Sequence, residues 1–95
     1  GRMWLGLRGP VLRTWACLLA FDFSISKKGR LRIDGEVRKI WLDLDGLGVR
    51  DLKREGEDLL ILAGPSMPLD GPALVYRWRN WSADEARRVA PERVL

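Results

Sequence analysis

Short apolar stretches separated by turn residues recur along the whole chain. In some of them apolar and polar positions alternate, as where Phe21, Phe23 and Ile25 are separated by single polar residues. A period of two is typical of a strand with one face toward a core. Other stretches, such as Leu59 to Ala63, are apolar throughout and indicate strands covered on both faces. The predicted strands span residues 3–7, 14–25, 31–33, 37–44, 49–52, 59–63, 73–79 and 92–95.

Turn residues bound these strands, and no long amphipathic helix lies between them. Gly9-Pro10 and Gly64-Pro65 each end a strand, Asp34-Gly35 predicts a tight turn, and residues 66–72 predict a loop. A single helical turn is expected at Ser82 to Glu85, which matches a capping box. Strands at intervals of roughly 8–12 residues predict an all-β fold of antiparallel sheets.

The chain contains an internal repeat. Leu5 to Pro10 returns as Leu60 to Pro65, and each copy leads through a loop into another apolar strand. We expect one β-repeat domain over residues 1–95, with unit one at about 3–45 and unit two at about 46–95. The first unit has three strands and the second has four, because no counterpart of the strand at 48–52 precedes Met3. Such a period falls in the range of propeller blades, so the chain resembles about two of them.

Five segments carry a likeness to known proteins: residues 4–13, 46–52, 58–65, 69–72 and 76–78. They resemble a bacterial domain-of-unknown-function family whose members look like longer, propeller-like repeat proteins. The resemblance covers most of the chain from residue 4 to about 81. It implies no activity, and it implies that most of a ring is missing here. Because open sheets expose edges and apolar faces, we expect a homo-oligomer, a dimer or larger.

The composition removes several kinds of chemistry. There is no His, and Cys17 is the single cysteine, in an apolar setting that predicts a buried thiol. Zinc sites, disulfides and catalytic triads are therefore not expected, and we predict no cofactor and no metal. No apolar run reaches the roughly 18–20 residues that span a bilayer, so we expect a cytoplasmic protein without a membrane partner.

Carboxylates are the remaining candidates for catalysis. They are Asp43, Asp45, Asp51, Asp58 and Asp70. The pair at 43 and 45 ends a strand, where solvated turn residues are common, and we expect no catalytic role. Arg50 and its neighbour at 51 point to opposite faces of a strand. We expect Arg50, Asp51 and Asp70 to be members of structural polar pairs.

The charge of +4 comes from 17 Lys and Arg against 13 Asp and Glu, with both signs dispersed. Four arginines are candidates for anion or nucleic-acid contact: Arg8, Arg13, Arg77 and Arg79. The first two flank a Gly-Pro turn, and Arg suits bidentate contacts with phosphate. The other two alternate with Tyr76 and Trp78, a mixture of basic and aromatic side chains found in nucleic-acid binders. Alternation also predicts that these aromatics face the core, so we do not expect nucleic acid as a partner.

We therefore expect a non-enzymatic module that associates with itself or with an unidentified protein partner. The alternative is a nucleic-acid or anion-binding module that uses the four arginines. A second alternative, a hydrolase-type enzyme, rests on analogy with propeller folds alone.

Overall fold

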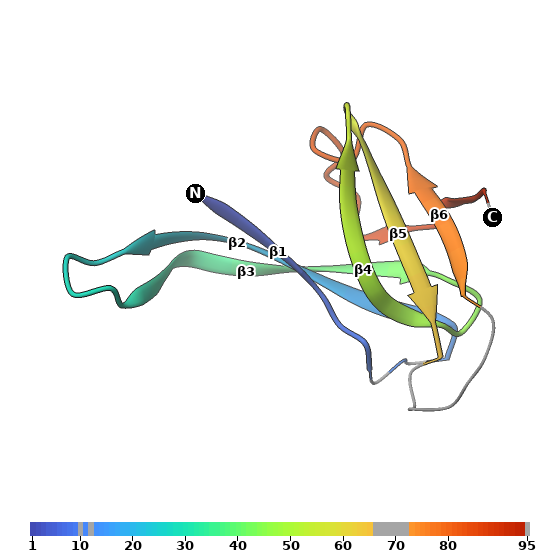
Figure 1. Ribbon diagram of the computed structural model, residues 1–95, viewed down its shortest axis with the longest axis horizontal. Helices are drawn as coiled ribbons and strands as arrows, with labels where there is room; N and C mark the ends of the chain where they lie inside the picture. Colours follow the sequence, from blue (N-terminus) through green and yellow to red (C-terminus); the bar gives the residue numbers. More distant parts are fainter. Residues whose placement is uncertain (10, 12, 66–72, 95) are drawn as a thin grey trace.

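Eight β-strands in two four-stranded sheets form the fold (Figure 1). A computed structural model describes residues 1–9, 11, 13–65 and 73–94, and no helix occurs in these ranges. The predicted all-β class is confirmed. The predicted turn at Gly9-Pro10 and loop at 66–72, which includes Asp70, fall wholly or partly outside the described residues.

The strands follow the apolar stretches of the sequence. Their bounds are β1 Arg2–Gly6, β2 Trp15–Ile25, β3 Leu31–Asp43, β4 Gly48–Glu55, β5 Asp58–Gly64, β6 Leu74–Trp78, β7 Arg88–Val89 and β8 Glu92–Arg93. The first sheet, sheet A, has the order β1-β2-β3-β7, and the second, sheet B, has the order β4-β5-β6-β8. Neighbouring strands are antiparallel except for β3 and β7, which are parallel.

The predicted turn at Asp34-Gly35 is wrong. β3 runs without interruption through both residues, and Gly35 has a φ of 76°. Ala20 pairs with Arg38 whereas Asp22 pairs with Asp34, so β3 accommodates two extra residues opposite β2. A glycine with positive φ serves a β-bulge as well as it serves a turn, and here the bulge joins two predicted strands into one.

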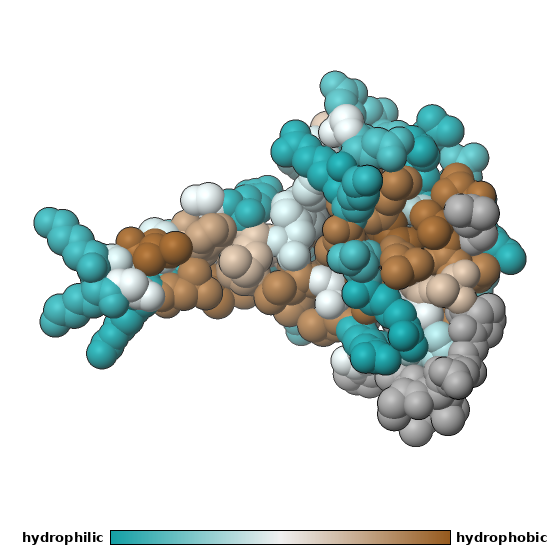
Figure 2. All heavy atoms as spheres, viewed as in Figure 1, coloured by the Kyte–Doolittle hydropathy of each residue, from teal (hydrophilic) through white to brown (hydrophobic). Residues whose placement is uncertain are grey.

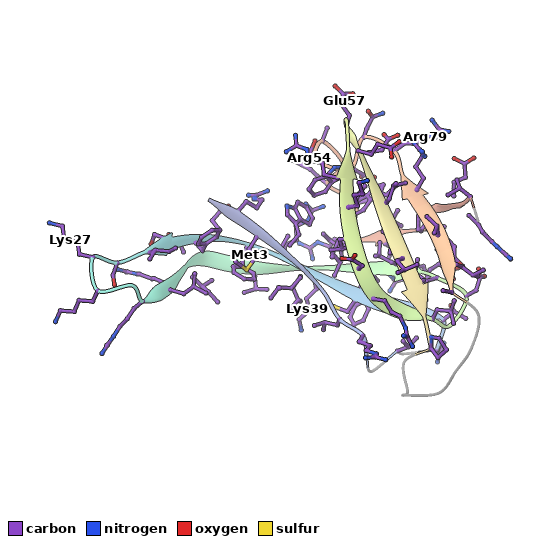
Figure 3. The ribbon with its side chains drawn as sticks, in the orientation of Figure 1. Met3, Lys27, Lys39, Arg54, Glu57 and Arg79 are labelled. Carbon is purple, nitrogen blue, oxygen red and sulfur yellow. The ribbon has the colours of Figure 1, made fainter. Side chains whose placement is uncertain are left out.

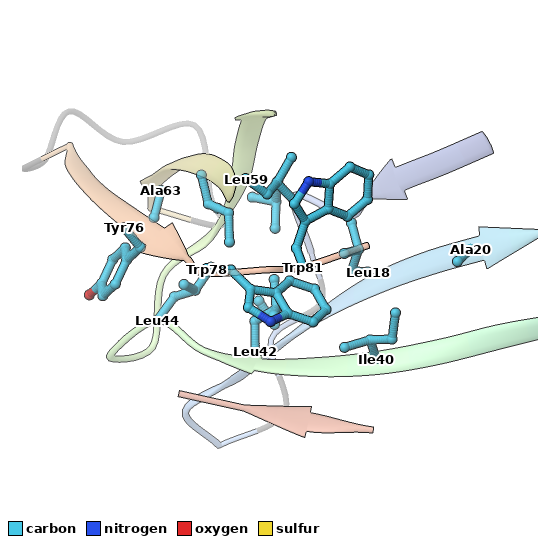
Figure 4. Close-up of a cluster of buried hydrophobic side chains, with 13 residues drawn as sticks. Leu18, Ala20, Ile40, Leu42, Leu44, Leu59, Ala63, Tyr76, Trp78 and Trp81 are labelled. Carbon is cyan, nitrogen blue, oxygen red and sulfur yellow. The ribbon is translucent and has the colours of Figure 1, made fainter. Parts of the chain in front are cut away.

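The two sheets pack face to face over an apolar core (Figure 4). Leu18, Ile40 and Leu42 of sheet A are fully buried against Ile61 and its neighbours in sheet B. Each such side chain stabilises the fold by roughly 1.5–3 kcal/mol relative to its exposed state. The core is therefore shared between the sheets, and neither sheet has a complete core of its own.

Glycines let the two sheets approach closely at one corner. A Cβ at Gly48 would lie 2.0 Å from the carbonyl oxygen of Arg8, and one at Gly6 would lie 2.2 Å from the side chain of Val49. The amide of Val49 donates to the carbonyl of Leu7 at 3.1 Å. These contacts join β1 directly to the start of β4.

The end of the chain returns to sheet A. After β6, residues 80–83 form a turn, in which the amide of Ala83 donates to the carbonyl of Asn80, and not the expected helical turn. Arg38 then donates to the carbonyls of Asp84 and Ala86. These bonds guide β7 alongside β3, although its residues belong to the predicted second unit. The sequence pattern did not indicate this strand.

The β2–β3 hairpin projects far beyond the rest of the molecule (Figure 1). We call its distal part, residues 21–37, the arm. The chain measures 43 × 29 × 21 Å, with a radius of gyration of 14.0 Å. A compact domain of this length has a radius of gyration of about 12 Å, so the arm accounts for the elongation. The described part of the chain contains no helix of a length and hydropathy that would let it span a bilayer.

Candidate interaction face

Sheet A has an apolar outer face, opposite the face that packs on sheet B. Antiparallel residues in direct register lie on the same face. Phe23 is opposite Ile33, and Ile25 is opposite Leu31, so their side chains form one continuous patch. Val37 lies on the same side, beyond the bulge. We call these five residues the arm stripe.

The arm stripe is exposed to solvent over most of its length. Ile25 is 65% exposed, Leu31 54%, Ile33 50% and Val37 42%. Single exposed apolar residues are common on protein surfaces, but contiguous ones usually mark a site of interaction. Brown spheres follow the arm in Figure 2, with hydrophilic side chains gathered at its tip.

Charge divides the arm into a basic tip and an acidic middle. The tip carries Lys27, Lys28, Arg30 and Arg32, and the first of them is labelled at the far end of the arm in Figure 3. The middle carries Asp22, Asp34 and Glu36. Arg2 bonds to the carboxylate at position 22 at 2.9 Å and lowers its pKa, which keeps that carboxylate charged.

The outer edge of β1 adjoins the same face. β1 is the first strand in the order of sheet A, whereas the corresponding β5 of sheet B has β4 beside it. Among the described residues, no strand pairs with this outer edge. A row of backbone groups is therefore available there, as it is in other sheet edges that recruit a further strand.

A pocket of about 390 Å³ lies at the opposite end of the outer face from the arm tip. Arg13, Trp15, Trp41 and Arg88 line it, and we call it the tryptophan pocket. The two indoles are diagonal neighbours on one face, because Trp15 pairs with Asp43 and Trp41 pairs with Cys17. The guanidinium carbon of Arg88 lies 5.9 Å from the centre of the Trp15 ring, within cation–π range.

Three strands and the segment before β2 supply the side chains of the tryptophan pocket. Arg13 precedes β2 with a φ of 60°, a left-handed conformation that is uncommon for residues other than glycine. Arg88 reaches the pocket because β7 pairs with β3 at Trp41. The sequence indicated Arg13 as an anion contact, but it gave no signal for the other three residues. They are distant in sequence and meet only through the pairing of β2, β3 and β7.

Two of the predicted anion contacts already have acidic partners. Arg77 bonds to Asp58 at 3.0 Å and to Glu55 at 3.2 Å, and Arg79 bonds to Glu92 at 3.2 Å. The pKa of Asp58 is lowered, first by the amide of Asn80 and then by Arg77. Arg77 lies on β6 of sheet B, and Arg79 follows directly after the end of that strand.

The aromatic neighbours of these arginines are core residues. Tyr76 is 2% exposed and Trp78 3%, so neither offers a ring face for stacking. Arg8, the remaining predicted contact, is exposed and lies at the corner where the sheets meet.

Arg50 and Asp51 make local contacts. The Arg50 guanidinium donates to the carbonyl of Pro65 at 3.2 Å and packs on Gly64. The Asp51 carboxylate accepts from the amide of Leu52 at 2.9 Å. Arg50 sits at a register shift of β4, and the structure does not bring it into an ion pair with its neighbour.

The candidate carboxylates are spread over the molecule. Asp43 accepts from the amide of Asp45, and Asp45 accepts from the hydroxyl of Tyr76. Burial, followed by the bond to Asp45, raises the pKa of Tyr76 to about 12. Burial also raises the pKa of the Cys17 thiol. Within the described ranges, no three His, Cys, Asp or Glu side chains gather into a potential metal site.

Comparison with known proteins places the chain in one family. No curated protein and no solved structure matches it. A family model with the description protein of unknown function (DUF3616) matches residues 1–95.

Proposed function

The chain belongs to the family of proteins of unknown function DUF3616, and we propose that it is a non-enzymatic module that dimerises through the arm stripe. Family membership confirms the predicted likeness to a domain-of-unknown-function family. The observation that carries the proposal is the exposure of the arm stripe on a hairpin that extends beyond the two-sheet body.

Burial of the arm stripe supplies the driving force. Covering a half-exposed Ile or Leu gains about 1 kcal/mol, and each copy contributes several such residues. The gain opposes the loss of translational and rotational freedom on association. A dimer with a dissociation constant in the micromolar range is therefore the expected outcome.

Charge favours a second copy of this chain as the occupant. In a two-fold dimer the same patch meets itself, with the two arms either parallel or antiparallel. Parallel arms would bring like charges together, so charge selects the antiparallel arrangement. The basic tip of one arm, with Lys27 and Lys28, then lies beside Glu36 in the acidic middle of its partner. Asp34 points to the other face and pairs with Arg32 of its own arm. Complementary charge steers such encounters and fixes their register. Each arm therefore carries both halves of the complementary surface.

A matched pair of variants tests this proposal. Ile33→Asp places a charge inside the arm stripe, whereas Ser24→Asp places one on the other face of the same hairpin. Both positions are exposed, so both variants are expected to fold. Size-exclusion chromatography with light scattering should give a monomer for Ile33→Asp and a dimer for Ser24→Asp. Equal masses for the two variants would contradict dimerisation through this stripe.

High salt gives a second readout. Screening of the tip and middle charges is expected to weaken the dimer several-fold without dissolving its apolar contact. If salt strengthens association instead, the arms do not run in opposite directions.

A further inference from the structure

We infer that the tryptophan pocket is a binding site for a nucleotide, in which the base stacks on Trp15 and Trp41 and the phosphate bonds to Arg13 and Arg88. The tryptophan pocket itself contains no residue of the arm stripe, which lies toward the other end of β2 and β3. The pocket volume, about 390 Å³, falls in the range of small-molecule sites.

The two indoles supply the base platform. Trp15 and Trp41 are only partly buried, unlike Trp78 and Trp81 of the core. Diagonal neighbours on a sheet lie about 7–8 Å apart, which leaves a flat ring in reach of both side chains. Stacking on aromatic side chains accepts any base, because every base has a π-face.

The two guanidiniums supply the phosphate contact. Arg13 and Arg88 are exposed, and neither forms an ion pair within the part of the chain that the structure describes. The Arg88 guanidinium lies over one side of the Trp15 ring, which holds it at the pocket. Arg fits phosphate through paired N–H donors, which a lysine does not offer. A nucleotide contacts both kinds of lining side chain, with its base on the indoles and its phosphate on the arginines. An apolar ring would contact only the indoles, and a bare anion would contact only the arginines.

An adjoining groove extends this site along β3 and β7. It is lined by Trp41 and Arg88 again, and also by Lys39 and Arg87. Among the described residues Glu36 is the one acid in its lining, and the groove reaches Val37 at the near end of the arm stripe. Asp43 lies opposite Trp15 on the same face as the pocket. Cations still outnumber acids around the pocket and groove. The groove has room for a second phosphate, so the nucleotide is either free or part of a single strand.

Titrations with three probes test the assignment. The probes are adenosine monophosphate, inorganic phosphate and a short oligothymidylate, and the readout is tryptophan fluorescence together with calorimetry. The mononucleotide should quench the fluorescence and bind at least about tenfold more tightly than phosphate, because only it can stack. Equal affinity for both, or no binding of the mononucleotide at millimolar concentration, would overturn the assignment.

Variants locate the binding. Arg88→Gln and Trp41→Leu should each lower affinity about tenfold. The control Arg30→Gln, which removes an exposed arginine at the arm tip, should leave affinity unchanged. If Trp41→Leu fails to fold, Arg13→Gln provides a second test, because it changes an exposed residue that does not pack in the core. Equal losses in the control and in the pocket variants would show unspecific charge attraction and contradict the site.

The oligonucleotide distinguishes the two sources of the nucleotide. Much tighter binding than that of the mononucleotide, lost in the same variants and steeply dependent on salt, identifies a single strand as the ligand. Equal binding identifies the free nucleotide. Both results support the pocket, and its failure would leave dimerisation through the arm stripe untouched.

Discussion

At the scale of residues, partners decide which side chains remain available to a ligand. Arg77 and Arg79 stand beside aromatic residues in sequence, yet both are paired with acids on sheet B. Arg13 stands alone in sequence and lies in the tryptophan pocket. Alternation predicted the inward direction of Tyr76 correctly, because period-two patterns report faces directly. It could not predict the meeting of Arg13 with Arg88, because that depends on strand pairing over 75 positions of sequence.

From the bond between Tyr76 and Asp45 we predict how the stability of the protein changes at alkaline pH. The pKa of Tyr76 is raised from 10 to about 12, so the folded state holds the phenolic proton more tightly than the unfolded state does. The stabilisation is complete below pH 10 and disappears as the pH rises toward about 12. Tyr76→Phe should lower the free energy of unfolding by about 1 kcal/mol at neutral pH.

Urea unfolding of both proteins at several pH values provides the measurement. The difference in free energy between wild type and Tyr76→Phe should shrink above pH 10, while general alkaline destabilisation affects the two alike. A difference that stays constant up to pH 12 would show that the pKa of Tyr76 is not raised in the folded state, and no difference at neutral pH would show that the hydroxyl bond does not stabilise the fold.

At the scale of elements, the sequence indicated strands better than it indicated their ends. The strands from β1 to β6 all fall on predicted apolar stretches, because alternation is a local property. The turn predicted at Asp34-Gly35 was wrong because these two residues suit both a turn and a bulge. The pairing of β3 with β2 produces the bulge. β7 has only two residues, too few for any periodic signal.

From the close contact between β1 and β4 we predict that replacing its glycines lowers the stability of the protein. Gly48→Ala should destabilise the protein by roughly 1–3 kcal/mol, because its Cβ would meet the backbone oxygen of Arg8. Gly6→Ala should also destabilise the protein, since its Cβ would meet a methyl group and the Cβ of the buried Val49. Thermal unfolding should show a loss of roughly 4–8 °C for each kcal/mol.

A compensating substitution serves as the control for this pair. Val49→Ala removes the obstructing methyl groups and should restore part of the stability of Gly6→Ala, but it should do nothing for Gly48→Ala. Rescue of both variants, or of neither, would contradict the contacts described for this corner.

At the scale of the whole molecule, the two sheets share a core, and the arm part of the outer face of sheet A is exposed among the described residues. The repeat in the sequence corresponds to the shared strand order, in which β1-β2-β3 matches β5-β6-β8. Among the described residues β1 is an edge strand, whereas its counterpart β5 lies between β4 and β6. The length of the arm was not expected, because the predicted turn at Asp34-Gly35 hid the continuity of β3. Because the bulge keeps β3 continuous, the hairpin is long enough to carry the exposed arm stripe. The sequence pattern did not predict this bulge.

Sedimentation equilibrium of the wild-type chain over a wide range of concentration tests the central proposal most directly. The monomer has a mass of 10.9 kDa. We predict that the average mass rises with concentration through the micromolar range and levels off at twice that value. A mass that stays at 10.9 kDa throughout this range would contradict dimerisation through the arm stripe.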